Sequence, residues 1–240
     1  MFHSKFVNIK SYRSVFYAVL MSLSLLLVSC SSIEKGTGEA KSDKKDQSTK
    51  DKSATSSSQG DLPASTRPAF TGVDPMAGIQ INPEIKKAYQ DVANFNKSKK
   101  YTQAVNLLNI IKSKYPQLSG PDYQKARIYF SQGKLDEALA AVDASLKNNP
   151  RNYYSLNLKG IILREQGKFD EAREIYLIAI EIYPPYPNSH LNLGVLADIY
   201  MRDLPLALIQ YKEYMNLVGK EDKTVANWVI ELERRIKSGE

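Results

Sequence analysis

Few side chains in this 240-residue chain have the chemistry of a nucleophile, a general base or a metal ligand. Cys30 is the only cysteine, and His3 and His190 are the only histidines. These three residues cannot form a His/Cys set with zinc-ligand spacing, and no Gly-rich phosphate loop occurs. The sequence therefore predicts a protein that is not an enzyme and has no metal or cofactor.

Paired carboxylates, which could do acid–base chemistry, occur twice in the same surroundings. The segment Gly133–Ala138, GKLDEA, returns as Gly167–Ala172, GKFDEA, 34 residues later. Each acidic pair follows a Gly-Lys turn, so it fits the start of a helix, where carboxylates interact favourably with the helix dipole. The pairs thus indicate a repeated structural unit and not a catalytic site.

The 34-residue period holds at further positions on both sides of these segments. It relates the sets Ala104, Ala138 and Ala172; Pro116, Pro150 and Pro184; and Ala126, Gly160 and Gly194. A fixed period of this size is typical of arrays in which each unit is one supersecondary element stacked on its neighbours. Small residues allow two helices to approach closely, and a proline ends the second helix.

This pattern resembles the tetratricopeptide repeat (TPR), a helix–turn–helix of 34 residues. The best copy carries, at the expected offsets, Tyr153, Leu156, Gly160, Leu163, Ala172, Tyr176, Ala179 and Pro184. The resemblance implies an all-α protein, a right-handed α-solenoid of about four helix–turn–helix units plus a C-terminal capping helix. We place the repeat domain at 81–240, with units at 85–118, 119–152, 153–186 and 187–221 and the capping helix at 222–237.

The fourth unit contains one residue more than the period allows. Ala207 follows Gly194 by 13 residues, whereas Ala172 follows Gly160 by 12. We assign the extra residue to the turn Arg202–Pro205, with Asp203 as the helix cap. Trp228, the only tryptophan, is expected to plug the core of the last repeat against the capping helix.

The first thirty residues indicate a different chemistry. Lys5, Lys10 and Arg13 precede an apolar run over 15–28, which is shorter than the roughly 20 residues needed to span a bilayer and is typical of a secretory signal. The end of the run, Leu27-Val28-Ser29-Cys30, resembles the lipobox of bacterial lipoproteins. That resemblance implies a signal peptide over 1–29, cleavage before Cys30 and acylation of its thiol with a fatty acid such as palmitate. The alternative is an unmodified thiol at the end of an uncleaved anchor.

The residues that follow favour one location. Lipoproteins kept in the inner membrane of Gram-negative bacteria typically carry Asp after the acylated Cys, and this chain has Ser31. The expected location is the outer membrane, lipid-anchored and facing the periplasm, for a Gram-negative source. Residues 31–60 contain only Ile33 as a large apolar side chain, so we predict a disordered linker over 30–80. Phe70 or Met76 is expected to pack on the first repeat, if either packs.

The net charge argues against nucleic acid as a partner. The formal charge is +7, but a chain without the signal peptide keeps 30 basic against 26 acidic side chains. An excess of four is too mild for a nucleic-acid footprint. We expect no small-molecule substrate either, because no motif for one was found.

The expected partner is another cell-envelope protein, bound as a peptide or helix in the concave groove. In the TPR family, the second, fifth, ninth and twelfth positions of each first helix line that groove. Here their aromatic, amide and guanidinium groups suit peptide recognition. The predicted groove residues are Tyr89, Asn96, Tyr123, Arg127, Phe130, Tyr154, Asn157, Arg164 and Asn188.

Several kinds of envelope protein share this layout of lipobox and helical repeats. The chain resembles pilotin-like assembly factors for a secretin or pilus, lipoproteins that organise cell-wall hydrolases, and accessories of TonB-type energy-transducing systems. A passive structural spacer is a further alternative. The sequence leaves these alternatives open.

Overall fold

The computed structural model describes residues 70–72, 74–76, 82–219 and 222–239. Within these ranges the chain is all-helical, which confirms the predicted fold class. The predicted signal peptide, Cys30 and most of the predicted linker lie outside them. No helix in the described ranges combines the length and apolarity that crossing a bilayer requires.

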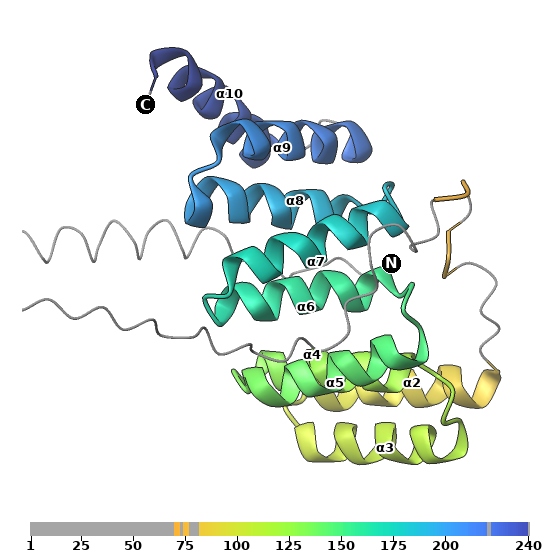
Figure 1. Cartoon of the computed structure of the whole chain (residues 1–240). Helices are drawn as coiled ribbons and strands as arrows, with labels where there is room; N and C mark the ends of the chain where they lie inside the picture. The colour runs from red at the N-terminus through yellow and green to blue at the C-terminus, as the bar shows by residue number, and fades with distance from the viewer. Residues whose placement is uncertain (1–69, 73, 77–81, 220–221, 240) are drawn as a thin grey trace, which may run out of the picture. The chain divides into compact units, whose positions relative to one another are not determined.

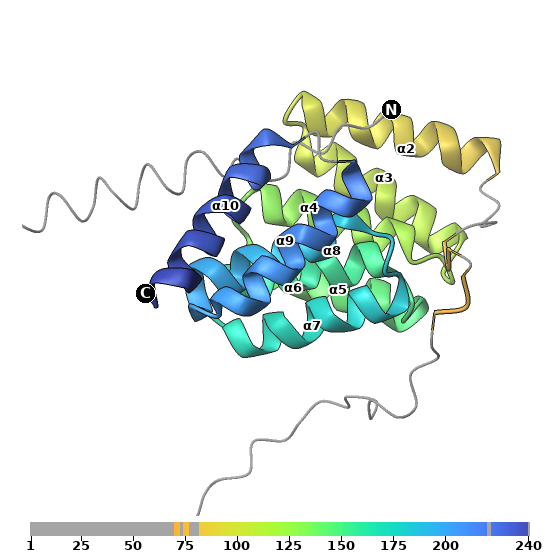
Figure 2. The same cartoon turned by 90° about the horizontal axis from the view of Figure 1, so that it is seen from above.

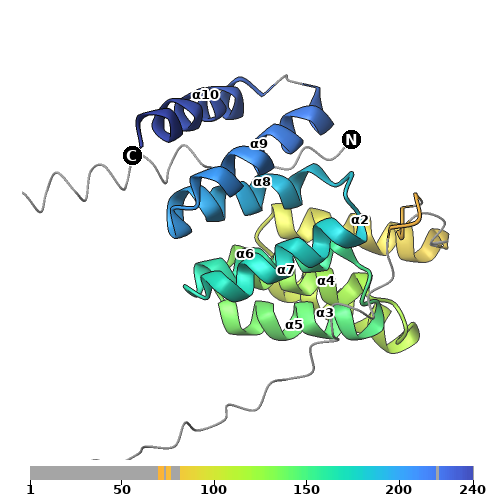
Figure 3. The ribbon, with the colours of Figure 1, turned by 45° about the horizontal axis from the view of Figure 1, so that its top comes forward.

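The helices pack as consecutive antiparallel pairs (Figure 1). The pairs are α2 (Pro83–Lys97) with α3 (Tyr101–Lys114), α4 (Gly120–Ser131) with α5 (Leu135–Asn148), α6 (Tyr153–Glu165) with α7 (Phe169–Ile182), and α8 (Pro187–Val195), extended by η2 (Leu196–Met201), with α9 (Leu204–Val218). The last helix, α10 (Lys223–Ser238), packs on α9 as the predicted cap (Figure 3).

The stack curves toward the first helix of each pair. Helix α4 contacts α6, and α6 contacts α8, whereas the second helices α3, α5 and α7 chiefly contact first helices. Figure 2 views the stack from the α10 end, with α8, α6 and α4 behind one another. Because the first helices lie closer together than the second ones, they form the concave face.

Glycines and alanines at the periodic positions bring the paired helices together. A Cβ atom built on Gly160 would lie 2.4 Å from the ring of Tyr176, and one on Gly194 would lie 2.6 Å from the ring of Tyr211. Both rings are buried, so the missing side chain is what lets each tyrosine pack against the facing helix. This confirms the predicted close contact at Gly160.

The helix boundaries follow from local sequence. Gly133, with φ +72°, adopts the left-handed conformation that favours glycine in the turn between α4 and α5. Asp136 and Asp170 lie in the first turns of α5 and α7. Asp203 caps α9, where its carboxylate accepts the Leu206 N–H at 3.0 Å.

The extra residue of the fourth unit is accommodated elsewhere than we expected. The turn before α9 consists of Arg202, in the left-handed conformation with φ 57°, and the cap Asp203, and the added residue is taken up inside the first helix, which becomes a π-helix over Leu196–Met201. A π-turn closes around one more residue than an α-turn, so it absorbs an insertion without losing backbone hydrogen bonds. Asp198, in the π-helix, accepts a hydrogen bond from Arg235 of α10 at 3.1 Å.

The expected linker also differs from the prediction at residues 70–76. Phe70 and Met76 do pack on the repeats, but on the third unit and not on the first. The ring of Phe70 lies 5.7 Å from that of Tyr183, and Met76 joins the buried cluster around Tyr153 and Ile182. The third unit offers an aromatic surface that no sequence period reveals.

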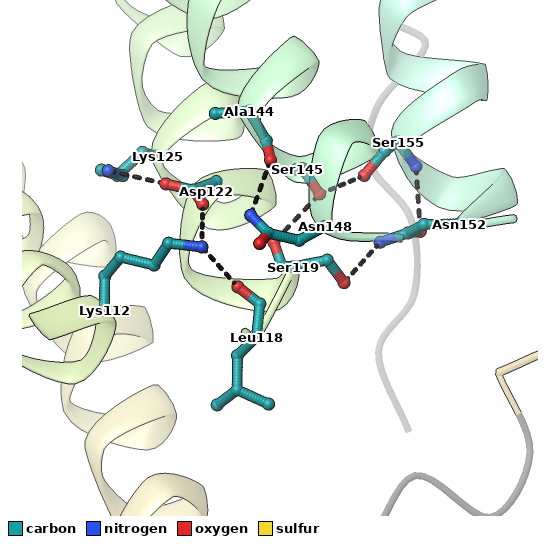
Figure 4. A network of polar contacts seen from close by, with 10 residues as sticks. All are labelled: Lys112, Leu118, Ser119, Asp122, Lys125, Ala144, Ser145, Asn148, Asn152 and Ser155. Atoms are coloured by element: carbon teal, nitrogen blue, oxygen red, sulfur yellow. Dashed lines mark hydrogen bonds and ion pairs between the residues drawn. The ribbon is translucent and has the colours of Figure 1, made fainter. Parts of the chain in front are cut away.

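A buried ion pair network joins the first two units (Figure 4). Asp122, at the start of α4, is 2% exposed. Its carboxylate contacts Lys112 of α3 at 2.7 Å and Lys125 at 2.8 Å. Lys112 also donates to the Leu118 carbonyl at 2.9 Å. A buried carboxylate with two lysine partners holds α4 against α3.

A neutral network continues from there to the third unit (Figure 4). The Ser145 hydroxyl donates to the Ser119 carbonyl at 2.9 Å and lies 2.8 Å from the Ser155 hydroxyl, which must then act as the donor. Asn152 donates to the Ser119 hydroxyl at 3.3 Å and caps α6 through Ser155 N–H. These bonds fix the relative position of α4 and α6, the helices that carry most predicted groove residues.

Candidate interaction site

Five tyrosines lie in ring contact where the second, third and fourth units meet. We call Tyr123, Tyr153, Tyr154, Tyr183 and Tyr186 the tyrosine cluster. The ring centroids of Tyr153 lie 4.3 Å from those of Tyr154, 4.6 Å from Tyr183 and 4.9 Å from Tyr186. Tyr154 extends the contacts to Tyr186 at 5.2 Å and to Tyr123 at 6.3 Å. Such contacts form because the first helices begin, and the second helices end, at the same edge of the stack.

Part of this cluster continues onto the concave face. Tyr123 and Arg127 belong to α4, Tyr154 to α6, and Tyr186 and Asn188 to the start of α8. We call these five residues the groove patch. All five are half-buried, so their side chains are supported from below and still reach solvent.

Hydrogen bonds and a cation–π contact order the groove patch. The Arg127 guanidinium lies 5.8 Å from the Tyr123 ring centroid and donates to Gln124 at 3.1 Å. Asn188 donates to the Tyr186 hydroxyl at 3.0 Å. Burial raises the pKa of Tyr186 to about 12, and burial likewise raises the pKa of Tyr123. These phenols are therefore neutral at physiological pH and offer a donor, an acceptor and an aromatic face.

The structure brings together four of the nine predicted groove residues, namely Tyr123, Arg127, Tyr154 and Asn188. Tyr89 lies apart from them, with its hydroxyl against Gly120 at the start of α4. Asn96 is half-buried near the end of α2, and Phe130 packs between the clusters of the second and third units.

Asn157 and Arg164 are more buried than a solvated groove lining should be. Asn157 is 7% exposed and accepts a hydrogen bond from Asn192 at 3.0 Å. Arg164 is 9% exposed, lies 5.9 Å from the ring of Tyr200 and donates to Glu165 at 3.0 Å. The fourth unit contacts both side chains, through Asn192 and Tyr200, so these two residues take part in the packing between the third and fourth units.

His190 is buried, and both of its ring nitrogens have hydrogen-bond partners. It is 6% exposed, and its two ring nitrogens lie 2.9 Å from Gln210 Oε1 and 2.9 Å from the Pro184 carbonyl. Trp228 contacts the buried Tyr211 ring at 5.4 Å. Within the described ranges, no group of three or more His, Cys, Asp or Glu side chains could hold a metal ion.

Three residues of the site do not occupy a groove position of a first helix and were therefore not predicted as groove residues. They are Tyr153, Tyr183 and Tyr186. Tyr153 occupies the first position of its unit, Tyr183 the end of a second helix, and Tyr186 the residue before a first helix. The signal available in the sequence was their crowding around Pro184-Pro185. Composition shows such crowding, but only the packing shows that all the rings touch.

The comparisons with known proteins agree with this architecture. Residues 123–187 match the tetratricopeptide repeat family model. The outer membrane protein assembly factor BamD of Neisseria meningitidis serogroup B is 27% identical over 138 residues, which cover 49% of this chain and 52% of that protein. The protein y4yS of Sinorhizobium fredii is 35% identical over 79 residues, 31% of this chain and 43% of that protein. The chain thus spans about half, or less, of the length of these curated relatives.

Solved structures share the fold. The structure of Pseudomonas aeruginosa pilF superposes with a TM-score of 0.57 at 20% identity, over 64% of this chain and 69% of that one. A chain of the Naa15/Naa10 complex bound to HypK-THB superposes with a TM-score of 0.51 at 24% identity, over 64% of this chain and 23% of that one. Together, the family match over 123–187 and the antiparallel helix pairs show that the described part of the chain has a fold like that of tetratricopeptide repeat proteins.

Proposed function

We propose that this protein is a non-enzymatic scaffold that binds a segment of another cell-envelope protein across the groove patch. The observation that carries the proposal is the continuity of the patch. Three successive first helices contribute Tyr123 and Arg127, Tyr154, and Tyr186 with Asn188 to one connected surface. A peptide lying along the concave face would meet all three helices at once.

The chemistry of the groove patch specifies the kind of segment. Rigid aromatic rings provide contact area at a small cost in side-chain entropy. The amide of Asn188 can pair with an extended peptide backbone, and Arg127 can pair with a carboxylate. The proposed ligand is a short segment with apolar side chains and at least one acidic residue.

The proposed location is the periplasmic face of the outer membrane of a Gram-negative bacterium. It rests on the lipobox-like Leu27–Cys30, with acylation at Cys30 and a signal peptide over 1–29. Several acyl chains of the kind found in lipoproteins would hold the repeats stably at the membrane.

Assembly of outer membrane proteins is a second, more specific candidate. The match to BamD, an outer membrane protein assembly factor, favours it. In this version the bound segment belongs to a protein that is being assembled or to another assembly component. The pilotin-like, TonB-linked and spacer alternatives have no separate support from the repeats.

The experiment that tests the scaffold is site-specific photocrosslinking in the native envelope. A photoreactive phenylalanine at Tyr154 is expected to crosslink one discrete partner, because Tyr154 lies at the centre of the groove patch. Matched probes at Ile110 of α3 and Ile209 of α9, which are 64% and 57% exposed on second helices, serve as controls. The same probe with Tyr123→Ala and Arg127→Ala should lose the crosslink.

The identified partner segment is then titrated against purified protein. Each alanine substitution in the groove patch is expected to weaken binding by about tenfold, the equivalent of about 1.4 kcal/mol for a central contact. Crosslinks confined to Ile110 and Ile209, with full affinity in the Tyr123→Ala and Arg127→Ala variants, would place binding on the convex face instead.

A further inference from the structure

Residues 70–76 contact the tyrosine cluster at the edge of the third unit (orange segment in Figure 1). The Phe70 ring meets the Tyr183 ring edge-to-face at 5.7 Å. The Tyr153 hydroxyl donates to Asp74 at 3.2 Å. Met76 packs in the cluster that contains Tyr153, and its sulfur accepts a hydrogen bond from Asn149 at 3.5 Å.

These contacts have the form of a short peptide bound to a preformed surface. Three side chains, spaced four and then two residues apart, make an aromatic, an acidic and a thioether contact. Asp74 also accepts the Met76 N–H at 2.8 Å, which gives this stretch a turn that ends at Met76. Thr71 and Gly72 between the contact residues are exposed. The surface therefore contacts side chains of defined chemistry at spaced positions of the segment, as peptide-binding surfaces do.

The edge surface is continuous with the groove patch. Tyr153 donates to the Asp74 carboxylate, and its ring lies 4.3 Å from that of Tyr154 and 4.9 Å from that of Tyr186, in tilted arrangements. Tyr153 is 1% exposed in this arrangement. A segment that contacts Tyr153 therefore also influences the packing of Tyr154 and Tyr186, two rings of the groove patch.

We propose that the surface formed by Asn149, Tyr153 and Tyr183 is a peptide-docking site that residues 70–76 occupy in cis, and that a partner segment of the same chemistry binds by displacing them. The partner chemistry is an aromatic residue, an acidic residue four positions later, and a methionine two positions after that. This inference rests on the proposed function, since it names a partner chemistry and a regulatory contact for the same tyrosine cluster.

Competition in cis sets the expected size of the effect. Met76 precedes the first residue of α2, Pro83, by only seven positions. A binding segment on such a short tether has an effective concentration of about 1 mM. If the separate segment binds with a Kd of about 0.1 mM, the cis copy weakens binding of a second copy by about tenfold.

The probe is a fluorescent synthetic peptide with the sequence of residues 68–78, added to the purified full chain in detergent and followed by anisotropy. The target is the triple variant Phe70→Ala/Asp74→Ala/Met76→Ala, in which the site is emptied. The peptide is expected to bind this variant about tenfold more tightly than it binds the wild-type chain. Thr71→Ala, a change at an exposed position of the same segment, is the matched control and should behave as wild type.

Two further variants keep the test decisive if the triple variant loses helicity. Asp74→Asn removes only the charge and should raise peptide affinity. Tyr153→Phe, added to Asp74→Asn, removes the hydroxyl from which the peptide aspartate would accept and should lower peptide affinity relative to Asp74→Asn alone. No binding to the emptied variant at millimolar peptide, or equal affinity for it and the wild-type chain, would overturn the proposal. The probe is a segment of this chain, so a negative result with it would not affect the crosslinking test at Tyr154. A failure of the crosslinking test would likewise not affect the measured binding of the probe peptide.

Discussion

Replacing Gly160 by alanine tests a close helix–helix contact, that between α6 and α7. Gly160 of α6 faces Tyr176 of α7, and a Cβ atom there would lie 2.4, 2.7 and 2.8 Å from three ring carbons. Tyr176 is fully buried, and Ala172 and Leu163 lie in the same core cluster. Because the ring is enclosed by the core and the added methyl group would overlap it, the ring or the two helices must shift.

Two opposing effects set the magnitude of the change. Overpacking a well-packed core costs about 1–3 kcal/mol, while a glycine-to-alanine change inside a helix contributes up to about 1 kcal/mol through helix propensity. The net expectation for Gly160→Ala is a loss of about 1–2 kcal/mol. For a domain of this size each kcal/mol lowers Tm by about 2–4 °C, which thermal and urea unfolding followed by circular dichroism can measure.

A second background separates the two effects. In Tyr176→Leu, the side chain opposite Gly160 is smaller, so the added methyl group no longer meets ring carbons. There Gly160→Ala should raise stability by the propensity term of up to about 1 kcal/mol, and the double-mutant cycle should show a coupling of 1 kcal/mol or more. A higher Tm for Gly160→Ala in the wild-type background would refute the reasoning, since it would mean that the ring yields at no cost.

Three other changes follow from the described contacts and the lipobox-like sequence. Asp122→Asn should destabilise the repeats by about 1–3 kcal/mol, because it leaves two lysines facing a neutral amide, whereas Glu84→Gln at the exposed pair with Lys114 should leave urea unfolding unchanged. Tyr186, whose pKa is raised to about 12 by burial, stabilises the fold fully below pH 10, and this contribution is lost as the pH rises through 12. Between pH 10 and 11.5, the unfolding free energy of the wild type should therefore fall by about 1.4 kcal/mol more per pH unit than that of Tyr186→Phe. Equal slopes in the two proteins would contradict the assignment. Cys30→Ser should abolish incorporation of radiolabelled palmitate and release the protein from membranes; mature-length variant that still sediments with membranes would exclude lipid anchoring at this residue.

The helix pairs and their close contacts were predictable because their signals are local. A 34-residue period, glycines in the turns before α5 and α7 and small residues at fixed offsets constrain the backbone directly, and the second and third units repeat the same constraints. The contact at Gly160, the first-turn acids of α5 and α7 and the cap at Asp203 therefore appear in the structure as expected.

Positional rules for the groove were less informative because burial depends on the neighbouring unit. Asn157 and Arg164 occupy groove positions of the first helix, yet the fourth unit covers both. The one-residue insertion of that unit changes the repeat spacing in the same way whether the extra residue lies in the turn or in the helix. In the structure the helix widens, and Asp198 of the π-helix pairs with Arg235 of α10.

What the sequence determined by itself is a solenoid of about four helix pairs with a capping helix, since small residues and helix ends recur about every 34 residues along most of the repeat domain. The tertiary structure alone decided which tyrosines form one cluster and that Phe70, Asp74 and Met76 dock on the third unit. Tyr123 and Tyr186 are 63 residues apart in the chain, and Asp74 and Tyr153 are 79 residues apart. No local pattern specifies such pairs, because they meet only after the units have stacked and brought the ends of their helices to one edge.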